Sequence, residues 1–564
     1  MKKTIILALI LSCAFVAYSQ TESQEAQQEV SRDLTVEREY DPVVANAKKI
    51  SPTPKKEVVE VEQPEITYTT WSKVEKTEKN SSVQEATDYQ AERTYEAKKG
   101  MFKAGLGFYW QTLGEFYYPL VQKEDHLLDV SVKHNGAFGN IKLEDATEPR
   151  AMDQITDLAL NYEVNFKKAK LESAVSYKFS SYDYYGMSTM ANDVMKNALG
   201  TNSDVDAFFK VYSTDHKSKL HYQFHAGYKY FCTNYNVGAH MIKAGFELAG
   251  KLNRGELGAE VDIDIDVLNK NKKAEETHLH TAGILNLTPF YKIHGEDWQL
   301  KVGAKLFIDL NEHAKRPFTA SADINGHLGL VPDVFYLYAG IGGGYKPNYY
   351  YDILRENQYI TPELEVNPTY TPFDVNLGLR VKIMDGLLFN VGLDYDLILD
   401  QYYFVNKAEL DENGALTGKY ANTFDVVTED LTHKVDVKAG LHFDYVKGLD
   451  LSLTAAYNYW EVSKNEYAWQ KPSWELEFKG TYRFLEKWEV GASYKMLADR
   501  KALVAGEVVK MNDIHDLDVW ASYKALDWLT VFIKGKNLAN QMSDTYYGYR
   551  NFGINALAGV TMLF

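Results

Sequence analysis

Three aspartates alternate with aliphatic residues in the stretch EVDIDIDV, residues 260–267. The positions of Asp262, Asp264 and Asp266 match the first, third and fifth ligands of an EF-hand calcium loop. That loop also requires glycine at its sixth position and glutamate at its twelfth, where this chain has valine and lysine. The pattern therefore fails as a calcium site, and we predict no metal ligands here.

An alternating stretch fits a β-strand better, because side chains two residues apart on a strand point to the same face. In a membrane β-barrel one face lines the lumen and the other contacts lipid. We therefore predict that the three aspartates form a lumen-facing acidic row and that the intervening valines and isoleucines contact lipid. Water and cations would screen the acids, or a basic stretch such as Lys48-Lys49 or Lys55-Lys56 would pair with them.

Few other residues are arranged for chemistry. His278 and His280 lie two apart in THLHT and would share one strand face, but no third metal ligand stands at a recognisable spacing. The sequence has no G-x-S-x-G, H-E-x-x-H, phosphate-binding loop or cysteine-histidine arrangement. We predict no catalytic residues, no metal and no cofactor, and we expect a protein that is not an enzyme.

The composition favours β-structure. The chain contains 41 Tyr, 26 Phe and 9 Trp with 37 Gly and only 14 Pro, a mixture that suits strands better than helices. Its formal net charge of -17 argues against nucleic acid as a partner, because a basic surface is expected there. After the N-terminal apolar run, no second run reaches the roughly 18 residues of a transmembrane helix. A membrane signal in this chain would therefore be spread over strands.

The N-terminal part divides into two predicted segments. Residues 1–20 have a basic start, an apolar centre and small residues at the end, which predicts a secretory signal peptide. Residues 21–99 are rich in Glu, Lys, Gln, Thr and Ser. Such a segment buries too little apolar area to offset its ordering entropy, so we predict an extended, charged periplasmic arm. Cys232 is then the one cysteine of the exported chain, which excludes an internal disulfide.

From residue 100 onward the chain repeats segments such as LDVSVKHNG and WQLKVGAKLFIDL, whose period of two indicates strands. Short polar turns alternate with longer loops, as in outer-membrane barrels. The turns lie near residues 122–125, 167–170, 214–217, 253–256, 294–297, 331–333, 384–386, 447–451, 485–487 and 525–527. Residues 100–564 are therefore predicted to form an all-β, transmembrane antiparallel β-barrel of about 22 strands (range 18–22), with the short turns in the periplasm.

Two further sets of residues fit this barrel. Tryptophans directly after short turns predict a periplasmic aromatic girdle, formed by Trp298, Trp488 and Trp528. The last ten residues, NALAGVTMLF, predict the strand that closes the barrel. One face of this closing strand would carry Ala558, Val560, Met562 and Phe564.

The stretch WLTVFIKGKNLANQMSDTYYGYRNFGINALAGVTMLF, residues 528–564, resembles the end of a TonB-dependent outer-membrane receptor barrel. Its Asn-Leu-Ala-Asn at residues 537–540 matches an N-L-x-N motif that precedes a tyrosine-rich loop and the final strand. Residues 103–118 and 33–44 resemble plugless members of the same group, and the resemblance implies that residues 21–99 form no plug domain. The resemblance implies the strand number counted above. A weak likeness to the TonB box, the segment that couples such receptors to TonB, covers Leu34, Thr35 and Val36.

We therefore expect a receptor-like channel or transporter for a solute, surrounded by the lipid of the cell outer membrane. The alternative is a structural or scaffold barrel of an outer-membrane protein assembly, in which residues 21–99 bind periplasmic or outer-membrane protein partners. A barrel this wide needs an obstruction, which the arm, inward-folding loops or a partner would supply. The longest loops are predicted at residues 348–368 and 404–429, and loops of this length commonly form lids or binding surfaces.

Overall fold

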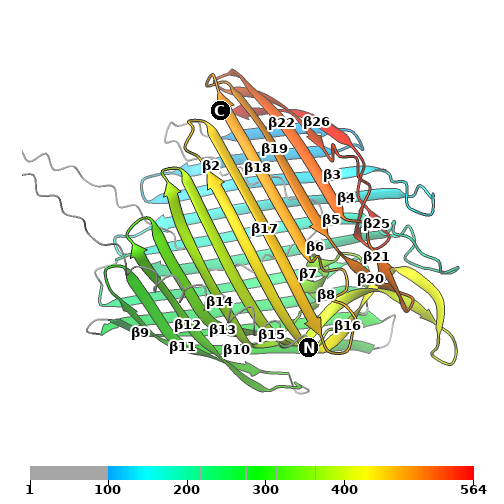
Figure 1. Cartoon of the computed structure of the whole chain (residues 1–564), viewed down its shortest axis with the longest axis horizontal. Coiled ribbons are helices and arrows are strands. Elements are labelled where there is room, and N and C mark those ends of the chain that lie inside the picture. The colour runs from blue at the N-terminus through cyan, green and yellow to red at the C-terminus, as the bar shows by residue number, and fades with distance from the viewer. Residues whose placement is uncertain (1–99, 216–217, 253–254, 273–275, 312–313, 363) are drawn as a thin grey trace, which may run out of the picture. The chain divides into compact units, whose positions relative to one another are not determined.

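Segments that alternate polar and apolar side chains form long antiparallel strands in the structure, which is a computed structural model (Figure 1). It describes residues 100–564 apart from 216–217, 253–254, 273–275, 312–313 and 363. The predictions for the signal peptide, the arm and the TonB-box-like residues Leu34, Thr35 and Val36 lie outside the described residues.

Within the described residues, 22 strands form one sheet, and each strand pairs antiparallel with its neighbours. β26 pairs with β1, so the sheet closes into a barrel without a free edge. The first strands are β1 Met101–Gly107, β2 Thr112–Gln122, β3 His126–Asn140, β4 Arg150–Asn165, β5 Ala169–Asp183, β6 Leu199–Ser213, β7 Leu220–Thr233, β8 Val237–Leu252, β9 Gly255–Lys272, β10 Glu276–His294 and β11 Trp298–Asp309. The remaining strands are β12 Phe318–Val331, β13 Phe335–Lys346, β14 Thr369–Met384, β15 Leu387–Leu410, β16 Leu416–Phe443, β17 Leu449–Val462, β18 Trp474–Phe484, β19 Trp488–Ala498, β22 Ile514–Leu526, β23 Leu529–Lys536 and β26 Asn555–Leu563. The predicted fold class and strand number are confirmed.

The two ends of the barrel differ in their connections. At one end, here called the short-turn end, short links join the strands at the positions predicted from the sequence, and β1 begins and β26 ends there. The opposite, long-loop end carries the larger connections. These include two small hairpins and one helix: β20 Lys501–Val504 with β21 Glu507–Lys510, β24 Asp544–Tyr546 with β25 Tyr549–Arg550, and α2 Tyr350–Glu356. Among the described residues, no helix has the length and apolar character needed to cross a membrane.

The two faces of the wall differ as the alternation predicts. On β8, Ala239 and Met241 are buried on the inner side, whereas Ile242 and Phe246 are 45% and 44% exposed on the outer side. The same outward exposure recurs around the sheet, for example at Val437 on β16. Exposed apolar side chains in such a row are what a barrel surrounded by lipid requires.

The prediction of a long loop at residues 404–429 is wrong. This segment belongs to a hairpin in which β15 and β16 stay paired well beyond the other strands, with only residues 411–415 as a link (Figure 1). Tyr403 faces Val427 and Val405 faces Asp425 across the pair. Aromatic and β-branched residues on facing strands favour continued pairing, which explains why the strands extend here.

Candidate functional site

The connection between β13 and β14, residues 347–368, folds into the barrel and reaches distant strands. The Tyr351 hydroxyl donates to Asp204 Oδ2 on β6 at 2.7 Å, and Gln358 Nε2 donates to Asp153 Oδ2 on β4 at 3.4 Å. Toward the strands that follow in the sequence, Lys471 Nζ in the connection between β17 and β18 donates to Glu356 Oε1 at 2.9 Å. Because these partners stand at separate places around the closed sheet, the segment crosses the lumen. We call the described residues of 347–368, that is all but 363, the crossing loop.

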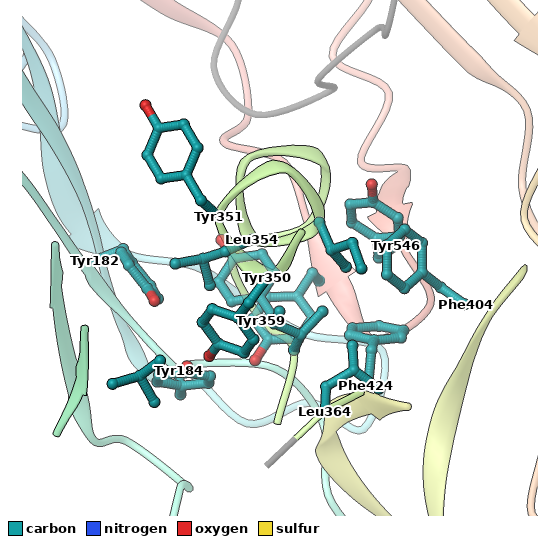
Figure 2. Packing of buried hydrophobic residues seen from close by; sticks show 14 of the residues in the cluster. Tyr182, Tyr184, Tyr350, Tyr351, Leu354, Tyr359, Leu364, Phe404, Phe424 and Tyr546 are labelled. Carbon is teal, nitrogen blue, oxygen red and sulfur yellow. The ribbon is translucent and has the colours of Figure 1, made fainter. Parts of the chain in front are cut away.

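Aromatic side chains from four segments pack around the crossing loop (Figure 2). We call the following residues the aromatic cluster: Tyr182, Tyr184, Tyr185, Tyr350, Tyr359, Tyr402, Phe404, Phe424, Tyr546 and Tyr549. Tyr359 is central, since its ring stacks on Tyr549 with ring centres 3.5 Å apart and meets Tyr182 edge-on at 5.9 Å. Such ring pairs contribute about 0.5–1.5 kcal/mol beyond the area they bury.

Backbone contacts join the crossing loop to the β15–β16 hairpin. Ile360 forms a parallel β-bridge with Phe424, and the Thr361 amide donates to the Phe424 carbonyl oxygen at 3.0 Å. The final long loop, residues 537–554, joins the same place, because the Tyr546 hydroxyl donates to the Glu356 carbonyl oxygen at 2.7 Å. These contacts satisfy polar groups that would otherwise be costly to bury. Loops that are far apart in sequence are therefore held together inside the barrel.

Glu356 is the charged member of this site. Its carboxylate accepts hydrogen bonds from the Tyr402 hydroxyl and from Lys471. Burial raises the pKa of the Glu356 carboxyl, but the Lys471 ammonium and the Tyr402 hydroxyl outweigh that effect, and the pKa lies below its ordinary value. Glu356 is therefore ionised at neutral pH and ties α2 to β15 and to the β17–β18 connection.

Arg500 anchors the final long loop to the connection between β19 and β22. Its side chain is buried and donates to the carbonyl oxygens of Asp544 at 2.7 Å, Thr545 at 2.9 Å and Asn512 at 2.9 Å. Burial lowers the pKa of the Arg500 guanidinium to about 10, so it still carries its charge at neutral pH. A buried cation that donates to several carbonyl groups fixes the loop geometry more strongly than a surface ion pair would.

The acidic row predicted at Asp262, Asp264 and Asp266 lies on β9. Lys243 Nζ on β8 is 2.9 Å from Asp264 Oδ2, and His225 Nε2 on β7 is 3.5 Å from Asp262 Oδ1. Within the described part of the chain, Asp266 Oδ1 is buried without a hydrogen-bond partner. Two of the acids thus find basic partners on the barrel wall, while the lysines proposed from the arm lie outside the described residues.

The aliphatic residues of the same strand stand on the other face. Val261 pairs with Phe246 and Ile265 pairs with Ile242, and both partners belong to the exposed outer row. Asp262 instead pairs with Asn286 of β10. His278 and His280 are part of β10, but their side chains lie outside the described residues. No group of three or more metal-binding side chains is present among the residues that the structure describes.

The residues of the predicted girdle fall at the short-turn end, and those of the predicted closing strand lie along β26 and just after it. Trp298 and Trp488 begin β11 and β19, Trp528 lies in the turn before β23, and all three are 40–48% exposed. Ala558, Val560 and Met562 stand on β26 opposite Leu106, Ala104 and Phe102 of β1. The ring of Phe564 stacks on Tyr118 with centres 6.1 Å apart, and the backbone of Phe564 exchanges hydrogen bonds with Gly100. Their roles as a girdle and a closing strand stay predictions.

The aromatic cluster is the part of the site that the sequence did not identify. The sequence does contain its signal, since Tyr349 to Tyr351 and Tyr546 to Tyr549 lie in tyrosine-rich loops. It also marks residues 348–368 as a long connection. Nothing in the spacing tells which loops meet, because Tyr359 and Tyr549 come together only after the barrel closes.

Comparisons with known proteins give a structural match without a sequence match. No protein-family model matches the chain, and no curated protein matches it. The siderophore receptor PirA from Acinetobacter baumannii is similar in structure, with a TM-score of 0.63, 11% identity, and coverage of 83% of this chain and 80% of the receptor. A mutant of the ferric enterobactin receptor PfeA from Pseudomonas aeruginosa, solved with enterobactin, has a TM-score of 0.61 and 12% identity. This match covers 82% of this chain and 81% of the receptor. The copper transporter OprC has a TM-score of 0.59 and 12% identity, and the match covers 83% of this chain and 80% of the transporter.

These likenesses establish the fold. The chain has the closed 22-stranded barrel found in outer-membrane receptors and transporters, which confirms the resemblance inferred from residues 528–564. The fold, the exposed apolar exterior and these neighbours agree with the predicted place in the cell outer membrane. The neighbours are receptors and a transporter, and the expectation that this chain is not an enzyme stays a prediction.

Proposed function

We propose that this protein is a receptor-like outer-membrane barrel that transports a solute, and that the crossing loop with its aromatic cluster is the gate. The long-loop end would then face outward and the short-turn end the periplasm. The observation that carries this proposal is the meeting of the crossing loop, the end of β5, the β15–β16 hairpin and the final long loop around Tyr359. An unobstructed barrel of this width would be a leak in the membrane, and the crossing loop stands where an obstruction is needed.

The contacts of the gate support movement rather than permanent closure. The crossing loop is held mainly by side-chain contacts, such as Tyr351 on Asp204 and Lys471 on Glu356, and its backbone pairing with β16 is limited to the bridge between Ile360 and Phe424. Side-chain contacts of this kind are individually weak, so a bound solute can displace them with a modest differential affinity. The gate would therefore respond to a ligand at the long-loop end.

Residues 21–99 form the second part of the proposal. The chain enters the barrel at Met101, beside Leu563 at the short-turn end, so the preceding residues are connected on that side. We propose that this segment acts as a periplasmic arm in place of a plug and contacts an envelope protein. Affinity capture with the full mature chain, and with a chain lacking residues 21–99, tests this: recovery of the same envelope proteins by both would contradict it.

The gate is tested by opening it. Replacing both stacked tyrosines in Y359A/Y549A removes two buried rings, at a cost of about 3–5 kcal/mol each. Cells that express this variant should become sensitive to vancomycin, an antibiotic too large to cross an intact outer membrane. The control is Y482A, because Tyr482 is 42% exposed on β18 outside the aromatic cluster. Equal resistance of the two variants, at equal barrel levels, would refute the gate.

A further inference from the structure

The inner wall of the barrel carries acids and lysines in unequal numbers at several places. On β15 and β16, Lys434 lies 3.8 Å from Asp396 and is also paired with Asp436, while Lys438 lies 3.6 Å from Asp394 and 3.7 Å from Asp436. Three carboxylates therefore share two ammonium groups. These residues face inward, since Val437 between them is 41% exposed on the outside.

The same arrangement recurs on β4 and β5, where Lys170 lies between Glu163 at 3.1 Å and Glu172 at 2.8 Å. Two carboxylates there contact one ammonium group. The acids of β22 are not in excess, because Lys534 of β23 is 2.9 Å from Asp518 and Lys495 of β19 stands opposite Asp516. The excess of carboxylates is therefore confined to particular parts of the wall.

The acidic row of β9 adds to this excess. Asp266 is 3% exposed, and its Oδ1 has no hydrogen-bond partner in the described part of the chain. Asp436 is also 3% exposed, and its Oδ1 has no hydrogen-bond partner among the described residues, whereas its Oδ2 faces Lys434 and Lys438. Carboxylate oxygens buried in this way retain unused capacity to accept a donor or to attract a cation.

We infer that the lumen selects for cations, so that the transported solute carries positive charge. This rests on the proposed function and names the class of its solute. Walls of one net sign with low dielectric around them concentrate counter-ions in the space between. The excess negative charge is distributed over β4, β5, β9, β15 and β16, so a solute meets it at several places around the passage.

The inference is tested by reversal potentials in planar bilayers under a potassium chloride gradient. The opened variant Y359A/Y549A supplies the current. It should pass potassium in preference to chloride by roughly five- to tenfold near 0.1 M salt, with the preference shrinking toward 1 M as screening shortens. A reversal potential of zero or of the opposite sign at low salt would overturn the inference. Absence of any current would instead count against the gate.

Charge variants sharpen the result because they act in opposite directions. In the opened background, D394N/D436N removes two carboxylates and should lower the potassium preference. K438Q removes a positive charge from the same group and should raise it. D262N/D266N should also lower the potassium preference and replaces the first variant if D394N/D436N does not fold. It removes two carboxylates from β9 and leaves the Lys243–Asp264 pair intact. E486Q, at an exposed position in a short turn, is the control that should leave selectivity unchanged. Identical selectivity in all four variants would overturn the inference.

A second readout does not require an open gate. A nitroxide at N286C, in a C232S background, would stand opposite Asp262 on the inner face. It should collide more often with a cationic than with an anionic relaxation agent, and D262N/D266N should reduce the difference. Equal collision rates with both agents would overturn the inference even if the barrel conducts no current.

Discussion

The barrel wall and the aromatic cluster inside it are held together by different means. In the wall, strand pairs such as β26 with β1 run through continuous backbone hydrogen bonds, and each residue contacts a partner on the neighbouring strand. In the cluster, Tyr359 and Tyr549 meet through ring stacking. Single hydrogen bonds from Tyr546 and Lys471 to Glu356 hold the residues around them. The wall supplies the stability of the fold, and the cluster can rearrange without unfolding it. Disrupting the cluster should therefore leave the wall largely intact, whereas preventing closure of the wall should also prevent the cluster from forming.

The largest effect is expected where the wall closes. A side chain at Gly559 would collide with the Ala104 carbonyl oxygen and with the Phe532 ring. G559V should therefore prevent β26 from pairing with β1, and most of the protein should fail to form the heat-modifiable barrel band on a gel. The control is A558V, because Ala558 is exposed on the outer face of the same strand. Normal assembly of G559V would contradict this description of the closing strands.

A smaller effect is expected where Arg500 anchors the final loop. R500L leaves the carbonyl oxygens of Asp544, Thr545 and Asn512 without their donor, at about 1–3 kcal/mol for each group. Amide hydrogen exchange in residues 543–551 should speed up by about tenfold or more, while exchange in the wall strands stays unchanged. R483L is the control, since Arg483 is 60% exposed and pairs with Glu489 at the short-turn end. Equal exchange in the two variants would show that Arg500 does not anchor the loop.

The smallest effect concerns pH. The pKa of Glu356 lies below its ordinary value of 4.5, so its contacts stabilise the gate fully above that value and are lost as the pH falls through the lower, folded-state pKa. The open probability of single channels should therefore increase by a few fold on acidification below about pH 4.5. E356Q should already be more open at pH 7 and should lose this acid response. Equal open probabilities of E356Q and the wild type at pH 7 would exclude Glu356 as a latch.

The two regions also differ in how far the sequence predicts them. The wall follows from local patterns, because a period of two and polar turns such as residues 294–297 specify strands without knowledge of the rest of the chain. Residues 404–429 form a hairpin instead of the predicted loop, because the polar residues near Asp411 resemble a loop although the flanking strands continue to pair. No local pattern in the sequence predicts the contact between Tyr359 and Tyr549. It depends on which loops the closed barrel brings together, so the sequence shows tyrosine-rich loops but not their partners.

The most direct test of a wall that is stable and a gate that moves is single-channel recording on a chain lacking residues 350–358. The matched control lacks residues 409–417, an equally long segment at the exposed tip of the β15–β16 hairpin. We predict that all three proteins assemble, that the wild type and the control stay mainly closed, and that the chain without α2 shows large, long-lived currents. An assembled chain without α2 that is as silent as the wild type would contradict the gate.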